Sequence, residues 1–160
     1  MQVELKTMSQ EQINEFLNSQ KVGLLSLSDG KSAYAVPLGY SFDGKDIYLT
    51  IANKGRKLAY IKACRNVCFT VYWLQDNFGV KTGMSYKSVI CDGVLEQISE
   101  PEAITRVIRN AEKHLGFPEG TWNHLLEMTL KDPANSGFWK INVTRIGSQM
   151  VNDVKEGAGA

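Results

Sequence analysis

Strict alternation of large and small side chains marks the segment from Ala33 to Phe42 and predicts a β-strand with two different faces. Asp-Gly pairs at 29–30 and 43–44 flank this segment and predict tight turns on either side. Gly93 interrupts a later apolar run and predicts a bulge or bend. The chain has five further strand-like runs: 21–28, 47–51, 67–73, 87–98 and 138–150. The six runs predict an antiparallel sheet that begins as a meander.

Four stretches between these strands carry apolar residues at the three- and four-residue spacing of a helix face. Ser9 with Gln12, and Ser99 with Glu102, have the spacing of a capping box, and Gly116 is typical of a helix end. We expect helices close to 10–19, 55–64, 99–116 and 122–132. Strands interrupted by helices in this way predict an α+β fold, here a small antiparallel barrel with peripheral helices.

The composition is that of one globular domain, with 160 residues of which 43% are apolar and 22% charged. We expect this domain to span residues 1–155, followed by a flexible tail at 156–160. Eighteen basic and seventeen acidic side chains give a net charge of +1, which argues against a broad nucleic-acid-binding surface. No stretch approaches the roughly 20 apolar residues of a membrane span, and no signal-peptide core is seen, so we expect a cytoplasmic protein.

Motifs for catalysis or metal binding are not found in the sequence. The three cysteines form no Cys-x-x-Cys pair and have no histidine nearby, so we expect buried or idle thiols in a reducing cytosol and no metal site. The two histidines lie on separate predicted helices. Motifs of hydrolases, nucleotide triphosphatases and Rossmann enzymes are also lacking, so no catalytic residue is assigned.

A basic segment follows the strand that ends near Thr50. Arg56 and Lys57 lie beside Gly55 at the start of a predicted helix, where the helix dipole already disfavours cations. A bound phosphate would resolve that conflict, because arginine can donate two parallel hydrogen bonds and the first N–H groups of the helix are free. A solvated surface cluster is the alternative interpretation.

The small face of the strand at 33–41 also admits two interpretations. Small side chains leave room for a flat ligand to approach the backbone, or they allow a helix to pack closely. Pro37 lacks an N–H group, so the strand is interrupted or lies at a sheet edge there.

Five short motifs occur in order: Tyr-Ala-Val-Pro-Leu-Gly-Tyr at 34–40, Asp-Ile-Tyr-Leu-Thr at 46–50, Gly-Arg-Lys at 55–57, Asn-Val-Cys-Phe at 66–69 and Tyr-Lys-Ser-Val at 86–89. Together they resemble the pyridoxamine 5'-phosphate oxidase-like superfamily of FMN-binding split β-barrels, nearest its nitroimidazole-resistance branch. The similarity covers residues 8–98 well and the remainder more loosely. It implies a six-stranded antiparallel split β-barrel and a homodimer with two FMN sites, each lined by both chains.

The resemblance also implies which residues contact the cofactor. Residues 36–39 would lie against the isoalloxazine ring, largely through their backbone, and residues 50 and 51 beside the ring or the ribityl chain. Arg56 and Lys57 would hold the phosphate, and Ser88 would contact the flavin from a neighbouring strand. Trp139 and Arg145 are further candidates. The implied cofactor-binding residues are Val36, Pro37, Leu38, Gly39, Thr50, Ile51, Arg56, Lys57 and Ser88.

Two departures from the superfamily pattern narrow the expected activity. The nitroimidazole-reductase branch commonly has a histidine where this chain has Thr50, which argues against nitroreduction by that route. The C-terminal substrate-binding arrangement of the oxidase is not found, which argues against a vitamin B6 oxidase. We expect an FMN-dependent oxidoreductase that acts on a small molecule, with no nucleic-acid or membrane partner. The alternative is a non-catalytic protein of the same fold that holds flavin, deazaflavin or haem.

Overall fold

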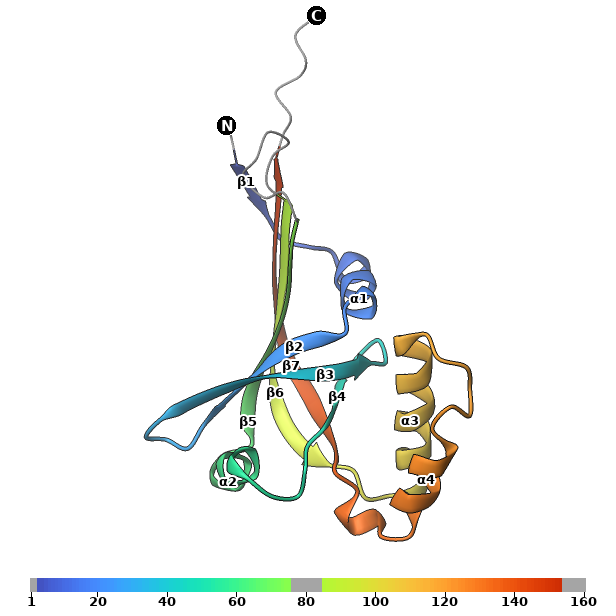
Figure 1. The fold of residues 1–160 in the computed structure, drawn as a ribbon. Coiled ribbons are helices and arrows are strands. Elements are labelled where there is room, and N and C mark those ends of the chain that lie inside the picture. The colour runs from blue at the N-terminus through green and yellow to red at the C-terminus, as the bar shows by residue number, and fades with distance from the viewer. Residues whose placement is uncertain (1–2, 76–84, 154–160) are drawn as a thin grey trace, which may run out of the picture.

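The computed structural model describes residues 3–75 and 85–153, which form seven strands and four α-helices (Figure 1). The strands are β1 (Val3–Lys6), β2 (Val22–Ser28), β3 (Ala33–Phe42), β4 (Ile47–Thr50), β5 (Asn66–Leu74), β6 (Ser85–Gln97) and β7 (Phe138–Asp153). The helices are α1 (Gln10–Ser19), α2 (Arg56–Ala63), α3 (Pro101–Leu115) and α4 (Asn123–Leu130), with a 3₁₀ turn at Pro133–Asn135. The predicted tail at 156–160 lies outside the described residues.

All strand pairings are antiparallel, and they close the sheet into a ring. The strand order is β1-β7-β4-β3-β2-β5-β6, with a further pairing between β7 and β6. This arrangement confirms the predicted α+β split barrel with peripheral helices. The described residues contain seven strands where six were predicted. The additional strand is β1, whose four residues alternate apolar and polar but form too short a run to predict a strand by themselves. Among the described residues it pairs with the end of β7.

β7 is the longest of the described strands and joins the two ends of the barrel. Its first residues pair with β4, its last with β1, and most of its length with β6. The predicted bulge at Gly93 lies in the β6–β7 pairing, where the register shifts between Asp92 and Gly93. A Cβ atom at position 93 would lie 2.4 Å from the carbonyl oxygen of Asn142, so this close backbone approach requires glycine.

Buried apolar side chains form two clusters that stabilise the fold by removing apolar surface from water. The larger cluster fills the barrel and includes Leu17 of α1, Leu25 of β2 and Phe69 of β5. The smaller cluster packs α3 against the sheet, with Ile104 beside Phe138 of β7. The barrel is therefore a filled core, and the surface available to a ligand lies at its edges and beneath the helices.

The start of α1 and the end of α3 follow local capping rules, whereas α2, α3 and α4 begin without a side-chain cap. α1 begins with the predicted capping box, in which Ser9 and Gln12 each accept a hydrogen bond from the other's backbone N–H. The predicted capping box of Ser99 with Glu102 does not form, since Glu100 is the N-cap of α3 and makes no side-chain cap hydrogen bond. α3 begins two residues later than predicted, because Pro101 occupies its first position, where the fixed φ of proline suits a helix. It ends at Gly116, whose φ is +80°. None of the helices in 3–75 and 85–153 is long and apolar enough to cross a membrane.

Candidate functional site

One edge of β3 is unpaired over most of its length. β2 pairs with residues 33–39 of β3, whereas β4 pairs only with residues 40–42. Because the N–H of Tyr40 donates to Lys21 on the β2 side, the N–H groups of residues 33, 35 and 39 point to the opposite side. Pro37 belongs to the same set, so its missing N–H removes no hydrogen bond from the sheet. Within the described residues this open edge is the split in the barrel, and it offers free backbone groups.

The small side chains of β3 face away from the barrel core. Those between Ala33 and Gly39 are exposed, while Val36 and Leu38 point the other way and are half-buried against the core. Farther along the strand, Ser41 is buried where α3 packs against β3. Both interpretations of the small face therefore hold, each for a part of β3. Residues 33–39 leave space for a ligand, and a helix packs against the end of the strand.

Arg56, the first residue of α2, lies against two aromatic rings. Its guanidinium carbon is 4.1 Å from the ring centroid of Tyr34 and 5.6 Å from that of Tyr60, which are cation–π contacts. Its Nη2 donates to the Tyr60 hydroxyl at 3.5 Å, and that hydroxyl is 2.7 Å from the hydroxyl of Ser32. The hydrogen bond with Ser32 and the one from Arg56 lower the pKa of Tyr60. These contacts hold Arg56 against Tyr34 of β3, which begins the motif at 34–40, whereas Tyr60 belongs to none of the five motifs.

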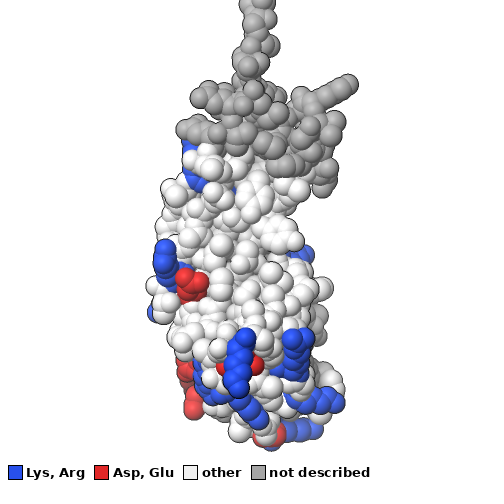
Figure 2. All heavy atoms as spheres, turned by 90° about the vertical axis from the view of Figure 1, so that its left-hand side faces the viewer, with Lys and Arg blue, Asp and Glu red and all other residues white. Residues whose placement is uncertain are grey.

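Basic side chains surround α2. Residues 54–65 contain no acidic residue and five basic ones: Lys54, Arg56, Lys57, Lys62 and Arg65. None of the five forms an ion pair with another described residue. Figure 2 shows basic side chains gathered at the lower end of the molecule, the end at which Figure 1 places α2. An anion that approaches the start of α2 therefore enters a positive potential.

The other predicted contacts lie in different environments. Thr50 is exposed at the end of β4, and Lys57 is half-buried in the first turn of α2. Ile51 has a fully buried side chain, and its N–H donates to the carbonyl of Gly137 at 2.8 Å, so a ligand could reach only its main chain. Ser88 is buried on β6, separated from β3 by two strands in either direction around the ring. One chain alone does not bring Ser88 to the open edge of β3.

An apolar cavity of about 320 Å³ lies between the sheet and the helices α3 and α4 (the sheet–helix cavity). Its sheet wall includes three of the predicted contact residues, Leu38, Gly39 and Thr50. Its helical wall includes Ala111 of α3 and Trp122 just before α4. The sequence patterns predict both helices, but the cavity depends on long-range packing of α3 on β3, which local patterns do not indicate.

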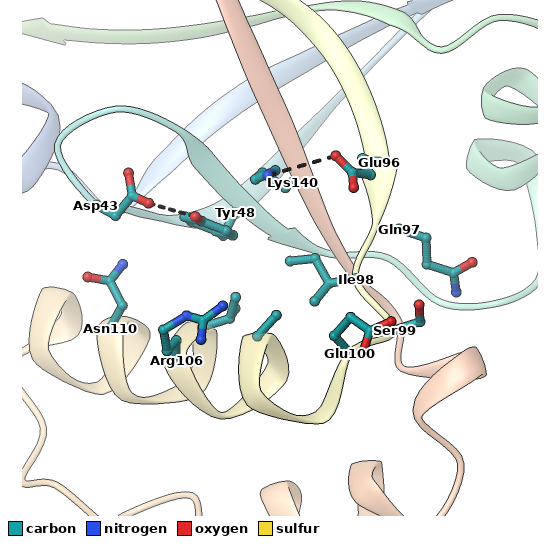
Figure 3. A pocket seen from close by; sticks show the side chains of 12 residues that line it. Asp43, Tyr48, Glu96, Gln97, Ile98, Ser99, Glu100, Arg106, Asn110 and Lys140 are labelled. Carbon is teal, nitrogen blue, oxygen red and sulfur yellow. Dashed lines mark hydrogen bonds and ion pairs between the residues drawn. The ribbon is translucent and has the colours of Figure 1, made fainter.

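A second cavity, of about 470 Å³, contains charges of both signs (Figure 3). Lys140 and Glu96 form an ion pair at 3.8 Å, and the Tyr48 hydroxyl donates to Oδ2 of Asp43 at 2.6 Å. Burial and this hydrogen bond raise the pKa of Tyr48 above its ordinary value. Tyr48 and Val107 line both cavities and separate the charged one from the apolar one.

Trp139 and Arg145 lie away from the open edge of β3. Trp139 is buried in the barrel core, and Arg145 is exposed on β7, in register with Asp92 of β6. The described residues include no group of three His, Cys, Asp or Glu side chains that could hold a metal ion. The open edge, the basic start of α2 and the sheet–helix cavity contain the other predicted contact residues apart from Ile51 and Ser88.

Residues 9–148 match the protein family described as pyridoxamine 5'-phosphate oxidase. Among solved structures, a proposed 5-nitroimidazole antibiotic resistance protein from Bacteroides thetaiotaomicron aligns with a TM-score of 0.73 at 16% identity, covering 94% of this chain and 90% of that one. A FAD-binding protein from Mesorhizobium loti aligns with a TM-score of 0.63 at 19% identity, covering 95% and 100%.

A flavocytochrome from Azotobacter vinelandii also shares the fold. It aligns with a TM-score of 0.70 at 17% identity, covering 95% of this chain and 73% of that one. No curated protein sequence gives a match. At these identities the structural similarities establish the fold alone.

Proposed function

Because the chain belongs to the pyridoxamine 5'-phosphate oxidase family, we propose that it is a flavoprotein that binds FMN at the open edge of β3. Two solved structures with this fold are described as a FAD-binding protein and a flavocytochrome, which supports a flavin as the class of cofactor. We propose FMN as the specific cofactor because the motifs at 34–40, 46–50 and 55–57 resemble those of the FMN-binding split β-barrels.

Two features of β3 carry this proposal. Its open edge presents unpaired N–H and C=O groups between Ala33 and Gly39, which suit the donors and acceptors along the polar side of a flavin ring. The same strand carries Tyr34, against which the Arg56 guanidinium is held. One strand therefore provides a backbone contact for a ring and a support for the arginine that would bind a phosphate.

The residues at the open edge of β3 and at the start of α2 fit FMN. A Cβ atom at Gly39 would meet only the Lys21 carbonyl oxygen, at 3.7 Å, so the space over this part of the strand is open. Arg56 and Lys57 would bind the phosphate through charge-assisted hydrogen bonds, and Thr50 would contact the ring or the ribityl chain. A bound flavin supplies hydride or single-electron transfer, while the protein binds it, orients it and tunes its electronics.

We also propose that a second copy of the chain completes the site. Val22, Tyr72, Leu74 and Ile90 expose between 44% and 61% of their surface on β2, β5 and β6. Figure 2 shows a broad surface without charged side chains above the basic end of the molecule. A dimer that covers this outer face of the sheet would bury the apolar side chains. Ser88 pairs with Tyr72 and so lies on the same face, where it would join the interface.

An absorption spectrum of the purified protein, with mass detection of the heat-released cofactor, tests the proposal. We expect flavin bands and released FMN. Release of FAD would support the assignment as a flavoprotein but exclude FMN as its cofactor. A Soret band would favour haem as the cofactor, and a deazaflavin mass would favour a deazaflavin. A colourless protein that takes up no added FMN would overturn the proposal.

We propose that the bound flavin turns over with a small-molecule substrate. Anaerobic addition of NADH or NADPH is expected to bleach the flavin bands, and a small acceptor is expected to restore them. A flavin that no donor reduces enzymatically would favour a carrier or sensor instead.

A further inference from the structure

The sheet–helix cavity has the size of a small-molecule site. Its volume of about 320 Å³ lies within the range of ligand pockets, roughly 300–1,000 Å³. The helical wall is apolar and includes Ala111, Trp122 and Leu125. Trp122 packs edge-on against Phe117, with ring centroids 5.4 Å apart, which limits its movement. The helices therefore enclose a defined apolar space above the end of β3.

Two of the polar side chains around this cavity, Tyr40 and Tyr48, are occupied by partners within the protein. The Tyr40 hydroxyl donates to the Leu17 carbonyl at 2.6 Å, and the Tyr48 hydroxyl donates to Asp43 at 2.6 Å. Among the described residues, no charged side chain lines the cavity. Thr50, exposed at the end of β4, can contribute a hydroxyl at the rim. A charged ligand would lose its hydration here without gaining a partner of opposite charge.

The position of the cavity relates it to the proposed flavin site. Leu38, Gly39 and Thr50 line the cavity, and the same three residues are among the proposed flavin contacts. A molecule in the cavity would therefore lie next to a ring held at the open edge. We propose that the sheet–helix cavity binds the uncharged, aromatic or apolar part of a small-molecule substrate. The assignment as substrate rests on the proposed flavin function, whereas the preference for an uncharged ligand rests on the cavity alone.

Two probes of nearly equal shape test this preference. 2-Acetylnaphthalene is neutral, and 2-naphthoate replaces its methyl ketone by a carboxylate. Equilibrium dialysis against the flavin-loaded protein is expected to show at least about tenfold tighter binding of 2-acetylnaphthalene, because the carboxylate finds no cation in the cavity. Equal affinities, or tighter binding of 2-naphthoate, would overturn the inference.

Substitutions in the wall of the cavity test whether 2-acetylnaphthalene binds there. Ala111→Trp fills the space between α3 and the sheet and is expected to abolish binding of 2-acetylnaphthalene. Leu125 lines the cavity but is 43% exposed, so Leu125→Trp is expected to leave the fold intact. The larger side chain narrows the cavity and is expected to weaken binding of 2-acetylnaphthalene at least threefold. Ala63→Trp is the matched control, because Ala63 is an exposed helical alanine on α2 outside the cavity. Equal binding by Leu125→Trp and Ala63→Trp would place the probe elsewhere.

Competition with the cofactor separates this inference from the proposed function. If 2-acetylnaphthalene binds only the flavin-free protein and FMN displaces it, the cavity is the place of the ring and the inference fails. If the protein takes up no flavin but still binds the neutral probe selectively, the flavin proposal and the substrate assignment fail, and the ligand preference of the cavity stands.

Discussion

Arg56 has an environment that distinguishes it from the lysines around it. Cation–π contact with Tyr34 and a hydrogen bond to Tyr60 restrict the guanidinium, so less conformational entropy is lost when it binds an anion. Lys54 and Lys62 are exposed on the same basic segment. At the scale of single residues, the proposed phosphate site is therefore a pre-oriented arginine within a positive field.

We predict that Arg56→Ala combined with Lys57→Ala raises the dissociation constant for FMN at least tenfold, because hydrogen bonds to charged groups contribute about 1.5–3 kcal/mol each. Fluorescence titration of the flavin-free protein measures the change. Lys62→Ala combined with Arg65→Ala removes the same charge near the C-terminal end of α2 and just beyond it, and is expected to have a smaller effect. Riboflavin, which lacks the phosphate, is expected to bind both double variants alike. Unchanged FMN binding would refute the phosphate assignment.

A second residue-scale prediction concerns Gly39 at the open edge. Gly39→Leu is expected to prevent flavin binding while changing the free energy of unfolding by less than about 1 kcal/mol, because the first added atom meets no close neighbour. Cofactor content of the purified variant and its urea denaturation curve provide the two measurements. A variant that folds and still binds flavin at full occupancy would show that the ring does not lie over Gly39.

At the scale of elements, Gly93 allows β6 and β7 to approach each other at the bulge. We predict that Gly93→Ala lowers the free energy of unfolding by about 1–3 kcal/mol, because its methyl group would overlap the backbone of Asn142. Gly147→Ala on β7 is the control, since a Cβ atom there has no neighbour within 4 Å. Urea denaturation of both variants measures the difference. Equal stabilities would show that the two strands can separate at the bulge without cost.

The connection between α3 and α4 depends on one buried carboxylate. Glu112 accepts hydrogen bonds from Arg109 at 2.9 Å and from the N–H groups of Gly120 and Trp122 at 3.1 and 2.8 Å. Burial alone would raise the pKa of Glu112, but these donors lower it below the ordinary value of 4.5. The ionised carboxylate therefore favours the folded state, and it holds Trp122 at the wall of the sheet–helix cavity.

The lowered pKa of Glu112 leads to a prediction about pH. Its contribution to stability is complete above pH 4.5 and is lost as the pH falls through its lower folded-state pKa. We expect Glu112→Gln to lower the Tm at pH 7, and the difference from the unsubstituted protein to narrow as the pH falls below 4.5. Thermal denaturation of both proteins from pH 7 to pH 3 measures this. A difference that stays constant would show that the carboxylate does not titrate in this range.

Local patterns in the sequence predict elements well but not their long-range pairing. Alternation predicts β3 with the observed bounds, and the capping box predicts the start of α1. The short β1 forms by pairing with β7, which lies far away in the chain. A local sequence pattern does not indicate such a pairing. The same limit applies to the site. A basic helix start points to Arg56, whereas its contact with Tyr34 and the covering of Leu38 by α3 and α4 depend on tertiary packing.

At the scale of the whole molecule, the exposed apolar side chains of β2, β5 and β6 favour a dimer. We predict that the protein is a dimer in light scattering and that Ile90→Glu raises the dimer dissociation constant at least tenfold, because it places an unpaired carboxylate in the interface. Leu130→Glu on α4, where the side chain is 38% exposed, is expected to remain dimeric. A monomeric unsubstituted protein would exclude the second copy as part of the site.

The pairings of β7 have a consequence for the way the chain folds. Asp153 lies in register with Val3, 150 positions earlier, and Ile141 with Ile47, 94 positions earlier. The ribosome must therefore synthesise β7 before the ring can close, and until then β4 and β6 each lack a neighbour. Contacts so distant along the chain slow folding, because a large loop must be ordered before they form. Closure by β7 is thus the late step at which the nascent protein acquires both its barrel and its protection from aggregation.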